Sequence, residues 1–234
     1  MIDAASVSGI RPQAVLFDLD GTLVDTALDL TAALNHVLTS IDLKPLADEA
    51  VRAYVSAGAG ALLALGLNTR IDDSHVAELR AEFLDYYGRN LAVHSCLFEG
   101  MDDLLEELAE AQIPWGIVTN KPRAYTLPLI DLLALRHQPA CVICGDDFAV
   151  KKPHPAPLTK AFRLLDTLPF HGMYVGDDRR DIIAGWRVGC STVVAGWGYL
   201  GPGESILTWG AHAICETPVA LSRLIFEQGI NPGS

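Results

Sequence analysis

This sequence has few basic residues compared with acidic ones, and it has no long apolar run. Lysine and arginine total 17 against 29 aspartate and glutamate residues, which gives a formal net charge of −12. Nucleic-acid grooves and surfaces that bind anionic membranes need basic patches, so we expect neither a nucleic-acid partner nor a membrane partner. No apolar stretch reaches the roughly 18 to 20 residues that span a bilayer. An anionic substrate would therefore have to be attracted locally, by a metal ion or a lysine.

Cysteine is also scarce. The chain has five cysteines, an odd number. We expect no signal peptide, and therefore reduced thiols in a cytoplasmic protein. Cys141 and Cys144 have the spacing of some redox and zinc motifs, but both lie inside an apolar, strand-like run. We therefore expect no redox or zinc chemistry there.

The hydrophobic content of the chain is enough for one sizeable core, since 50% of the 234 residues are hydrophobic. Five short apolar runs predict buried parallel strands, at 14–18, 115–119, 140–144, 172–176 and 192–195. Amphipathic segments predict helices, at 100–111, 122–135, 156–166, 178–188 and 217–228. This alternation predicts an α/β fold, a Rossmann-like doubly wound parallel sheet with helices on both faces.

The interval 26–95 departs from this alternation, because its apolar residues recur at helical spacing and it has no evident core strand. We therefore predict an all-helical insertion at 26–95 in a catalytic core formed by 1–25 and 96–234. Within the insertion, Gly58 and Gly60 lie in a loop that permits close approach to a ligand. A plain turn between two helices is the alternative for this loop.

Two carboxylates one residue apart stand where the first predicted strand ends. Asp18 and Asp20 can face the same pocket, because alternate residues of an extended segment point to the same side. They repel unless a cation, a proton or separate roles relieve the cost. One could attack an electrophile while the other transfers the proton of the leaving group. Gly21 permits a tight turn, and Thr22 supplies a supporting hydroxyl within reach of either carboxylate; an Asp- and Gly-rich turn is the alternative.

Polar residues also follow the next two predicted strands. Thr119 and Asn120 end the second strand, where such a pair often only caps a helix. Lys151 and Lys152 follow the third strand and precede a proline, so that they are presented on an extended loop. A lysine there would neutralise a phosphate group.

A third group of carboxylates follows the strand-like run at 172–176. Asp177, Asp178 and Asp181 begin the next amphipathic segment, where acidic residues also favour a helix start. At the end of a third parallel strand they would meet Asp18 and Asp20 and complete an oxygen-only site suited to Mg²⁺. Three carboxylates and a phosphate dianion would repel by about 4 kcal/mol for each pair of like charges at about 4 Å and an effective dielectric of about 20. A divalent cation offsets this repulsion, which one lysine cannot do.

The segment at 17–26, FDLDGTLVDT, resembles the first motif of the haloacid dehalogenase superfamily, most of whose members are magnesium-dependent phosphatases. The resemblance implies that Asp18 is the nucleophile and Asp20 the general acid/base. Its second motif implies that Thr119 binds a phosphate oxygen. Its third motif has a lysine directly before a proline, which implies Lys152 as the lysine of the site.

The fourth motif of the superfamily is met in both of its forms, as GDD and as GD followed later by another aspartate. The resemblance implies Asp177 as a metal ligand together with Asp18 and Asp20. Asp178 and Asp181 remain alternatives for the role of supporting the metal site.

Longer runs resemble one part of the superfamily in particular. The insertion occupies the position of the helical cap in one large branch, which includes phosphoglycolate phosphatases. The runs at 118–122, 152–158, 175–185 and 196–199 are especially similar to N-acetylmuramic acid 6-phosphate phosphatases. These motifs imply the phosphoryl chemistry, but they say little about the identity of the substrate, because the cap contacts the part of the substrate beyond the phosphate.

We therefore expect a cytoplasmic, Mg²⁺-dependent phosphomonoesterase that works through an aspartyl-phosphate. Its substrate would be a small phosphorylated metabolite, N-acetylmuramic acid 6-phosphate or 2-phosphoglycolate. The substrate contacts expected are Thr119, Asn120, Lys152, Gly58 and Gly60. A phosphosugar mutase and a non-catalytic sensor of phosphorylated metabolites are the alternatives, and we expect a monomer or a weak homodimer.

Overall fold

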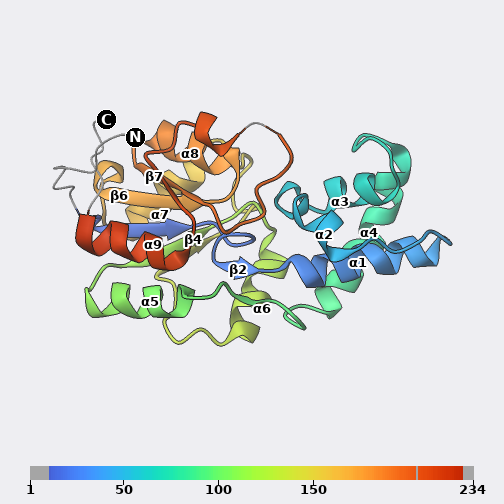
Figure 1. The fold of residues 1–234 in the computed structure, drawn as a ribbon, viewed down its shortest axis with the longest axis horizontal. Coiled ribbons are helices and arrows are strands. Elements are labelled where there is room, and N and C mark those ends of the chain that lie inside the picture. Colours follow the sequence, from blue (N-terminus) through green and yellow to red (C-terminus); the bar gives the residue numbers. More distant parts are fainter. Residues whose placement is uncertain (1–10, 204, 229–234) are drawn as a thin grey trace.

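In the computed structural model, which describes residues 11–203 and 205–228, the core is a six-stranded parallel sheet (Figure 1). The ends of the predicted core at 1–10 and 229–234, and residue 204, lie outside the described residues. The strand order is β5-β4-β1-β6-β7-β8. The strands are β1 (Ala14–Phe17), β4 (Trp115–Val118), β5 (Cys141–Ile143), β6 (Gly172–Gly176), β7 (Ser191–Ala195) and β8 (Ala213–Cys215). The predicted fold class is confirmed.

Five strands lie within or beside the predicted runs, whereas β8 is additional. It has three residues, stands at the edge of the sheet beside β7 and is only partly buried. So short an edge strand has too few apolar side chains to stand out in a sequence.

Helices cover both faces of the sheet because the side chains of each buried strand alternate between the faces. Val15 and Phe17 of β1 join one hydrophobic cluster, and Ala14 and Leu16 join another. The first face carries α5 (Met101–Glu110), α6 (Arg123–Leu133) and α9 (Pro218–Arg223); the second carries α7 (Ala156–Leu164) and α8 (Arg179–Val188). Short helical turns complete the core, at Pro169–His171, Ile206–Thr208 and Leu224–Gln228.

The segment between β1 and α5 extends away from the sheet as a group of helices (Figure 1). It contains α1 (Ala27–Ser40), α2 (Asp48–Arg52), a turn at Val55–Ala57, α3 (Ala59–Gly66) and α4 (Ser74–Arg89). These helices share a hydrophobic cluster of their own. An antiparallel pair, β2 (Val24–Asp25) and β3 (Cys96–Leu97), joins them to the core. Two-residue strands leave no periodicity, so the sequence does not predict this pair.

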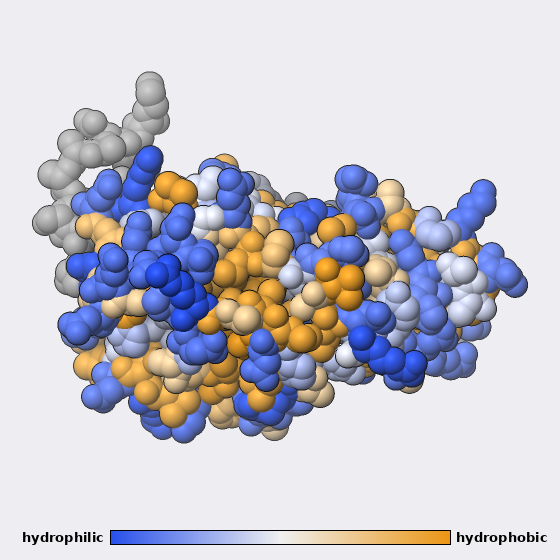
Figure 2. All heavy atoms as spheres, turned by 90° about the horizontal axis from the view of Figure 1, so that it is seen from below, coloured by the Kyte–Doolittle hydropathy of each residue, from blue (hydrophilic) through white to orange (hydrophobic). Residues whose placement is uncertain are grey.

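Figure 2 views the molecule from the side on which α5 and α6 lie in Figure 1. Apolar residues gather near the middle of this face, and hydrophilic residues are spread over both the sheet part and the helical part. Within the described part of the chain, no helix combines the length and apolar character that crossing a bilayer requires.

Candidate active site

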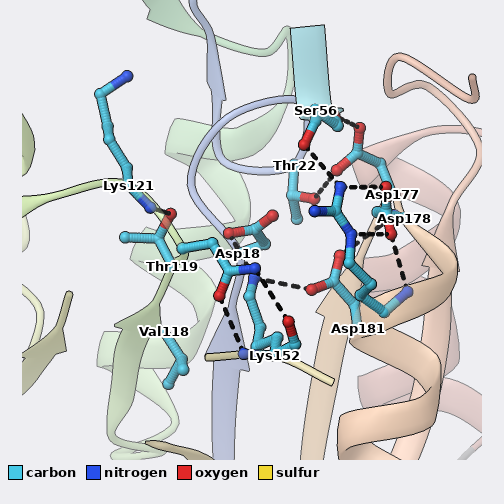
Figure 3. A network of polar contacts seen from close by, with 12 residues as sticks. Asp18, Thr22, Ser56, Val118, Thr119, Lys121, Lys152, Asp177, Asp178 and Asp181 are labelled. Carbon is cyan, nitrogen blue, oxygen red and sulfur yellow. Dashed lines mark hydrogen bonds and ion pairs between the residues drawn. The ribbon is translucent and has the colours of Figure 1, made fainter. Parts of the chain in front are cut away.

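Polar side chains from the carboxyl ends of neighbouring strands meet at one edge of the sheet (Figure 3). Asp18 follows β1, Thr119 follows β4 and Asp177 follows β6. Lys152 comes from the loop after β5, and its Nζ lies 2.8 Å from Asp18 Oδ1. Because β4 and β6 flank β1 on opposite sides, this edge is the topological switch point at which open α/β sheets place their ligand sites.

A cavity of about 500 Å³ lies between this edge and the helical insertion. The core lines it with Asp18, Asp20, Thr119 and Lys152, among others. The insertion lines it with residues of α3, α4 and the turn before α3. Cavities of this size hold small molecules, so the site is open to a metabolite on the side of the insertion.

Asp18, Asp177 and Asp181 form the acidic cluster of this site. One carboxylate oxygen of each lies within 4.8 Å of the other two, and all three residues are buried. Burial, followed by repulsion from Asp18 and Asp181, raises the pKa of Asp177 to about 8. Burial also raises the pKa of Asp181 to about 7, although the ammonium group of Lys152 opposes this. The protein's own cations therefore leave the charge of the cluster incompletely balanced.

The acidic cluster fits Mg²⁺, because its donors are hard carboxylate oxygens. Asp18 Oδ1 is buried without a hydrogen bond of good geometry, although Lys152 Nζ pairs with it by charge. Such an oxygen is available to a cation. The side chain of Asp20, which the resemblance implies as a further ligand, lies outside the acidic cluster of the described residues.

Asp177 is held by donors from three separate parts of the chain. Thr22 Oγ1 donates to Oδ1 at 3.2 Å, and the backbone N–H of Tyr199 donates to Oδ2 at 3.0 Å. Ser56 Oγ, from the turn before α3, also donates to Oδ2, at 2.8 Å. Thr22 thus supports Asp177, whereas the sequence places its hydroxyl near Asp18 or Asp20. The insertion reaches the acidic cluster directly through Ser56.

Lys152 is a buried cation placed between two carboxylates. Its Nζ lies 2.8 Å from Asp18 Oδ1 and 2.7 Å from Asp181 Oδ1, and it donates to the hydroxyl of Tyr174 at 2.9 Å. Burial opposes its charge, but attraction to Asp18 and Asp181 raises the pKa of Lys152. Lys151 also lines the cavity but is exposed, so the two lysines lie in different environments, Lys152 buried among the carboxylates and Lys151 open to solvent.

Asp20 lies in a second charged group, which the sequence analysis missed. Its Oδ1 accepts hydrogen bonds from Thr26 Oγ1 at 2.6 Å and from Lys121 Nζ at 2.8 Å. Lys121 Nζ also donates to the hydroxyl of Tyr87, on α4, at 2.7 Å. Although burial opposes the charge of Lys121, attraction to Asp20 raises its pKa. A lysine directly after Asn120 at a strand end is the signal that could have identified it.

Thr119 and Asn120 have different surroundings. Thr119 is buried and lines the cavity, where its hydroxyl accepts a long hydrogen bond from the backbone of Lys121 at 3.2 Å. The amide of Asn120 bonds twice with the backbone of Lys152, accepting from its N–H at 3.0 Å and donating to its carbonyl at 3.1 Å. Asn120 therefore positions the loop of Lys152, and its direct contact with substrate stays a prediction.

Asp178 and Asp181, the two alternatives for supporting the metal, occupy different places. Asp181 belongs to the acidic cluster. Asp178 caps α8 by accepting from the backbone N–H of Arg180 and also pairs with the guanidinium of Arg180. Arg180 in turn donates to the carbonyl of Ser56 at 2.7 Å. Asp178 thus holds a second link between core and insertion.

Two glycines of the site have positive φ. Gly21, at +83°, has no room for a side chain, because a Cβ would lie 2.2 Å from Oδ2 of Asp177. Gly58 also has a φ of +83°, but a Cβ there would meet nothing within 4 Å. Gly60 has no such φ, and its Cβ would only touch Ile71 at 3.4 Å. Gly58 and Gly60 both line the cavity, and their contact with substrate stays a prediction.

Comparisons with known proteins agree with this fold. The profile of the haloacid dehalogenase-like hydrolase family matches residues 15–195. The N-acetylmuramic acid 6-phosphate phosphatase of Pseudomonas putida is 38% identical over 216 residues, which are 92% of this chain and 97% of that protein. A phosphoglycolate phosphatase of Xanthomonas campestris pv. campestris is 38% identical over 210 residues, 90% of this chain and 95% of that one.

Solved structures give the same result. A crystal structure described as a predicted phosphoglycolate phosphatase from Haemophilus somnus has a TM-score of 0.77 at 26% identity, covering 89% of this chain and 96% of that chain. The resemblance seen in the motifs is confirmed: the chain belongs to the haloacid dehalogenase-like hydrolase family.

Proposed function

We propose that this phosphatase hydrolyses the monoester of a small phosphorylated metabolite through an aspartyl-phosphate on Asp18, with Mg²⁺ bound at the acidic cluster. The observation that carries the proposal is the meeting of Asp18, Lys152 and the acidic cluster at the switch point of the sheet, with Asp20 two residues from Asp18.

Asp18 attacks the phosphorus atom and forms the bond to phosphorus as the ester oxygen leaves. Lys152 and Thr119 hold the phosphoryl oxygens, where a buried ammonium group stabilises the added negative charge. Asp20 donates a proton to the departing alkoxide and then takes one from the water that hydrolyses the aspartyl-phosphate. Thr26 and Lys121 keep Asp20 in place for both steps, because both donate to its Oδ1.

Asp18 and Asp177, with Asp181 beside them, would hold Mg²⁺. Bound there, the ion would neutralise phosphate charge and polarise phosphorus. The raised pKa of Asp177 supports this, because burial and then repulsion from neighbouring carboxylates disfavour its charged form, which a bound cation would stabilise.

Two substrates are candidates from the relatives, one named for N-acetylmuramic acid 6-phosphate and the other for phosphoglycolate, at the same 38% identity. The motifs describe phosphoryl chemistry that both substrates share. A cytoplasmic location and a monomer or weak homodimer remain part of the proposal.

Phosphate release from both metabolites and from an aryl phosphate tests this function. We expect turnover with Mg²⁺, none in excess chelator, and no rescue by Ca²⁺, which takes more ligands at longer distances. Release of free phosphate without a sugar bisphosphate activator separates the enzyme from a mutase, and turnover of the aryl ester separates it from a sensor. Undiminished release in chelator would contradict the metal-dependent mechanism.

A further inference from the structure

One face of α4 forms a wall of the cavity opposite the acidic cluster. Residues of this helix that line the cavity recur at helical spacing, namely Val76, Ala77, Arg80, Phe83, Leu84 and Tyr87. All but Arg80 and the hydroxyl of Tyr87 are apolar. Among the cavity-lining residues that the insertion contributes, Arg80 is the only charged one.

Three cations that the core contributes to the cavity already have carboxylate partners, whereas Lys151, from the loop after β5, lines it on the side of the phosphoryl site. Lys152 pairs with Asp18 and Asp181, and Lys121 with Asp20. Arg180, at the same cavity, pairs with Asp178. These three cations therefore hold carboxylates of the site in place.

Arg80 has no such partner. Its neighbours one turn away on α4 are Val76, Ala77, Phe83 and Leu84, so no acidic residue can pair with it along the helix. No carboxylate in the described ranges 11–203 and 205–228 lies within salt-bridge distance of its guanidinium. Arg80 is exposed and lines the cavity. In a chain of net charge −12, an arginine left without an acid among apolar cavity residues is available to an anionic group of a ligand.

The position of Arg80 along α4 sets its distance from the phosphoryl site. Tyr87 marks the near end of the wall, because its hydroxyl accepts a hydrogen bond from Lys121, which also contacts Asp20. Arg80 lies seven residues earlier, about 10 Å along the helix axis at about 1.5 Å per residue. A ligand that reaches both ends needs an anionic group separated from its phosphate by a body of several ångströms with apolar surface.

We propose that Arg80 binds the carboxylate of the substrate, and that the substrate is a phosphorylated sugar acid rather than a two-carbon acid. This inference rests on the proposed phosphatase function and chooses between its two candidate substrates. In N-acetylmuramic acid 6-phosphate a sugar ring separates the phosphate from the carboxylate of the lactyl ether. In 2-phosphoglycolate one carbon separates the ester oxygen from the carboxylate, which is too short to reach from Asp18 to Arg80.

Steady-state kinetics on four phosphate esters test this assignment. N-acetylmuramic acid 6-phosphate and N-acetylglucosamine 6-phosphate share ring and phosphate, but only the first carries the carboxylate. 2-Phosphoglycolate carries the carboxylate without the ring, and an aryl phosphate carries neither. The variants are Arg80→Met, which keeps a long apolar stem, Arg80→Lys, which keeps the charge, and the control Arg89→Met. Arg89 lies on the same helix, pairs with Asp85 and does not line the cavity.

We expect the wild type to prefer the muramic ester to the glucosamine ester. Arg80→Met should lower kcat/KM on the muramic ester about tenfold or more, mainly through KM, as expected for the loss of a charge-assisted hydrogen bond. It should change kcat/KM on the glucosamine, glycolate and aryl esters less than about twofold. These esters have no carboxylate that reaches Arg80, so they have no contact with Arg80 to lose. Arg80→Lys should recover part of the loss, and Arg89→Met should resemble the wild type.

An equal loss on both sugar phosphates, or no loss on the muramic ester, would overturn the role of Arg80. A wild type that prefers 2-phosphoglycolate, with Arg80→Met reducing that activity, would overturn the choice of a sugar acid. Normal turnover of the aryl ester in these cases would leave the phosphatase function standing. A wild type that releases phosphate from none of the four esters would instead overturn the proposed function and this inference together.

Discussion

Lys121 is the residue whose contacts most directly concern the proposed general acid/base. Replacing it with methionine removes one of the two donors to Asp20 Oδ1 and leaves Thr26 as the other. We expect Lys121→Met to slow hydrolysis of an alkyl phosphate at least about tenfold more than that of a nitrophenyl phosphate, because only the alkoxide needs a proton as it departs. Single-turnover rates on the two esters measure this difference.

Tyr87→Phe and Lys160→Met serve as the comparison for this variant. Tyr87→Phe removes only the hydrogen bond from Lys121 to the Tyr87 hydroxyl and keeps the ring beside the ammonium group, so its effect should be smaller. Lys160 is exposed on α7. A thermal melt verifies that each variant is folded. An equal slowing of both esters by Lys121→Met would show that the lysine supports the fold and not proton transfer.

Asp177 should make the metal-free protein less stable as the pH rises. Its pKa in the folded protein, about 8, lies above the ordinary value of 3.8, so folding favours its neutral form. Neutral Asp177 makes its full contribution to the free energy of unfolding below about pH 4. This contribution is lost as the pH rises through about 8. In excess chelator, we expect Tm to fall more steeply between pH 5 and pH 9 in the wild type than in Asp177→Asn.

The size of this effect is measurable, since ~1 kcal/mol corresponds to about 2 to 4 °C in Tm for a chain of this length. The amide of asparagine fits the site, because the hydroxyl of Thr22 can accept from it while Ser56 and the Tyr199 N–H donate to its oxygen. Saturating Mg²⁺ should flatten the wild-type curve. Parallel curves for the two proteins in chelator would show that Asp177 is ionised throughout this range.

Residues at strand ends could be predicted from the sequence, whereas their partners across the site could not. Asp18, Thr119 and Asp177 each follow a recognisable apolar run, so their meeting follows from a parallel sheet. The contact of Lys121 with Tyr87 depends on how α4 packs over the sheet, which no local pattern records. The pairing of Thr22 with Asp177, 155 positions apart, is likewise a product of the fold.

The loop before α3 gives a prediction at the level of one structural element. Gly58 has a φ of +83°, which side chains rarely adopt, whereas Gly60 has an ordinary φ near the start of α3. We therefore expect Gly58→Ala to lower Tm and Gly60→Ala to leave it nearly unchanged. Gly60→Val should fill space in the cavity and lower kcat/KM on the metabolite relative to the aryl ester, by ~1 to 3 kcal/mol in discrimination.

Thermal melts measure Tm of each variant, and the ratio of kcat/KM on the metabolite to that on the aryl ester measures the effect on substrate discrimination. If Gly60→Val folds and the ratio stays within about twofold of the wild type, the loop does not contact the substrate, and its glycines serve only the turn between helices.

The helices and central strands could be predicted from the periodicity of apolar residues. The burial of some side chains could not, because it depends on tertiary contacts. Leu28 fits the helical spacing of its neighbours, yet it is 43% exposed, because it lies on the side of α1 away from the other helices of the insertion. Tyr199 comes from the core after β7 but packs in the hydrophobic cluster of the insertion. Neither position can be assigned from spacing alone, since each depends on the way the two parts of the chain meet.

At the scale of the whole molecule, hydrogen bonds at several places within the described residues join the insertion to the core. Ser56 donates to Asp177, and Tyr87 accepts from Lys121. At the base of the insertion, the hydroxyl of Tyr199 accepts from the backbone N–H of Thr26 at 2.6 Å and donates to Asp25 at 3.0 Å. The first two contacts involve the site itself, so the position of the insertion and the arrangement of the catalytic groups depend on each other.

The central claim of this account is the covalent bond between phosphorus and Asp18. Its most direct measurement is acid quenching of Asp20→Asn during turnover of a nitrophenyl phosphate with Mg²⁺, followed by peptide mass analysis. Loss of the base that activates water should let the intermediate accumulate, so a burst of nitrophenolate should accompany one phosphoryl group on the peptide that contains Asp18. Asp18→Asn should show neither and should lose at least about 10³-fold in rate, or ~4 kcal/mol of barrier. A burst with the phosphoryl group on another residue, or Asp18→Asn retaining more than about a tenth of the wild-type rate, would contradict the account.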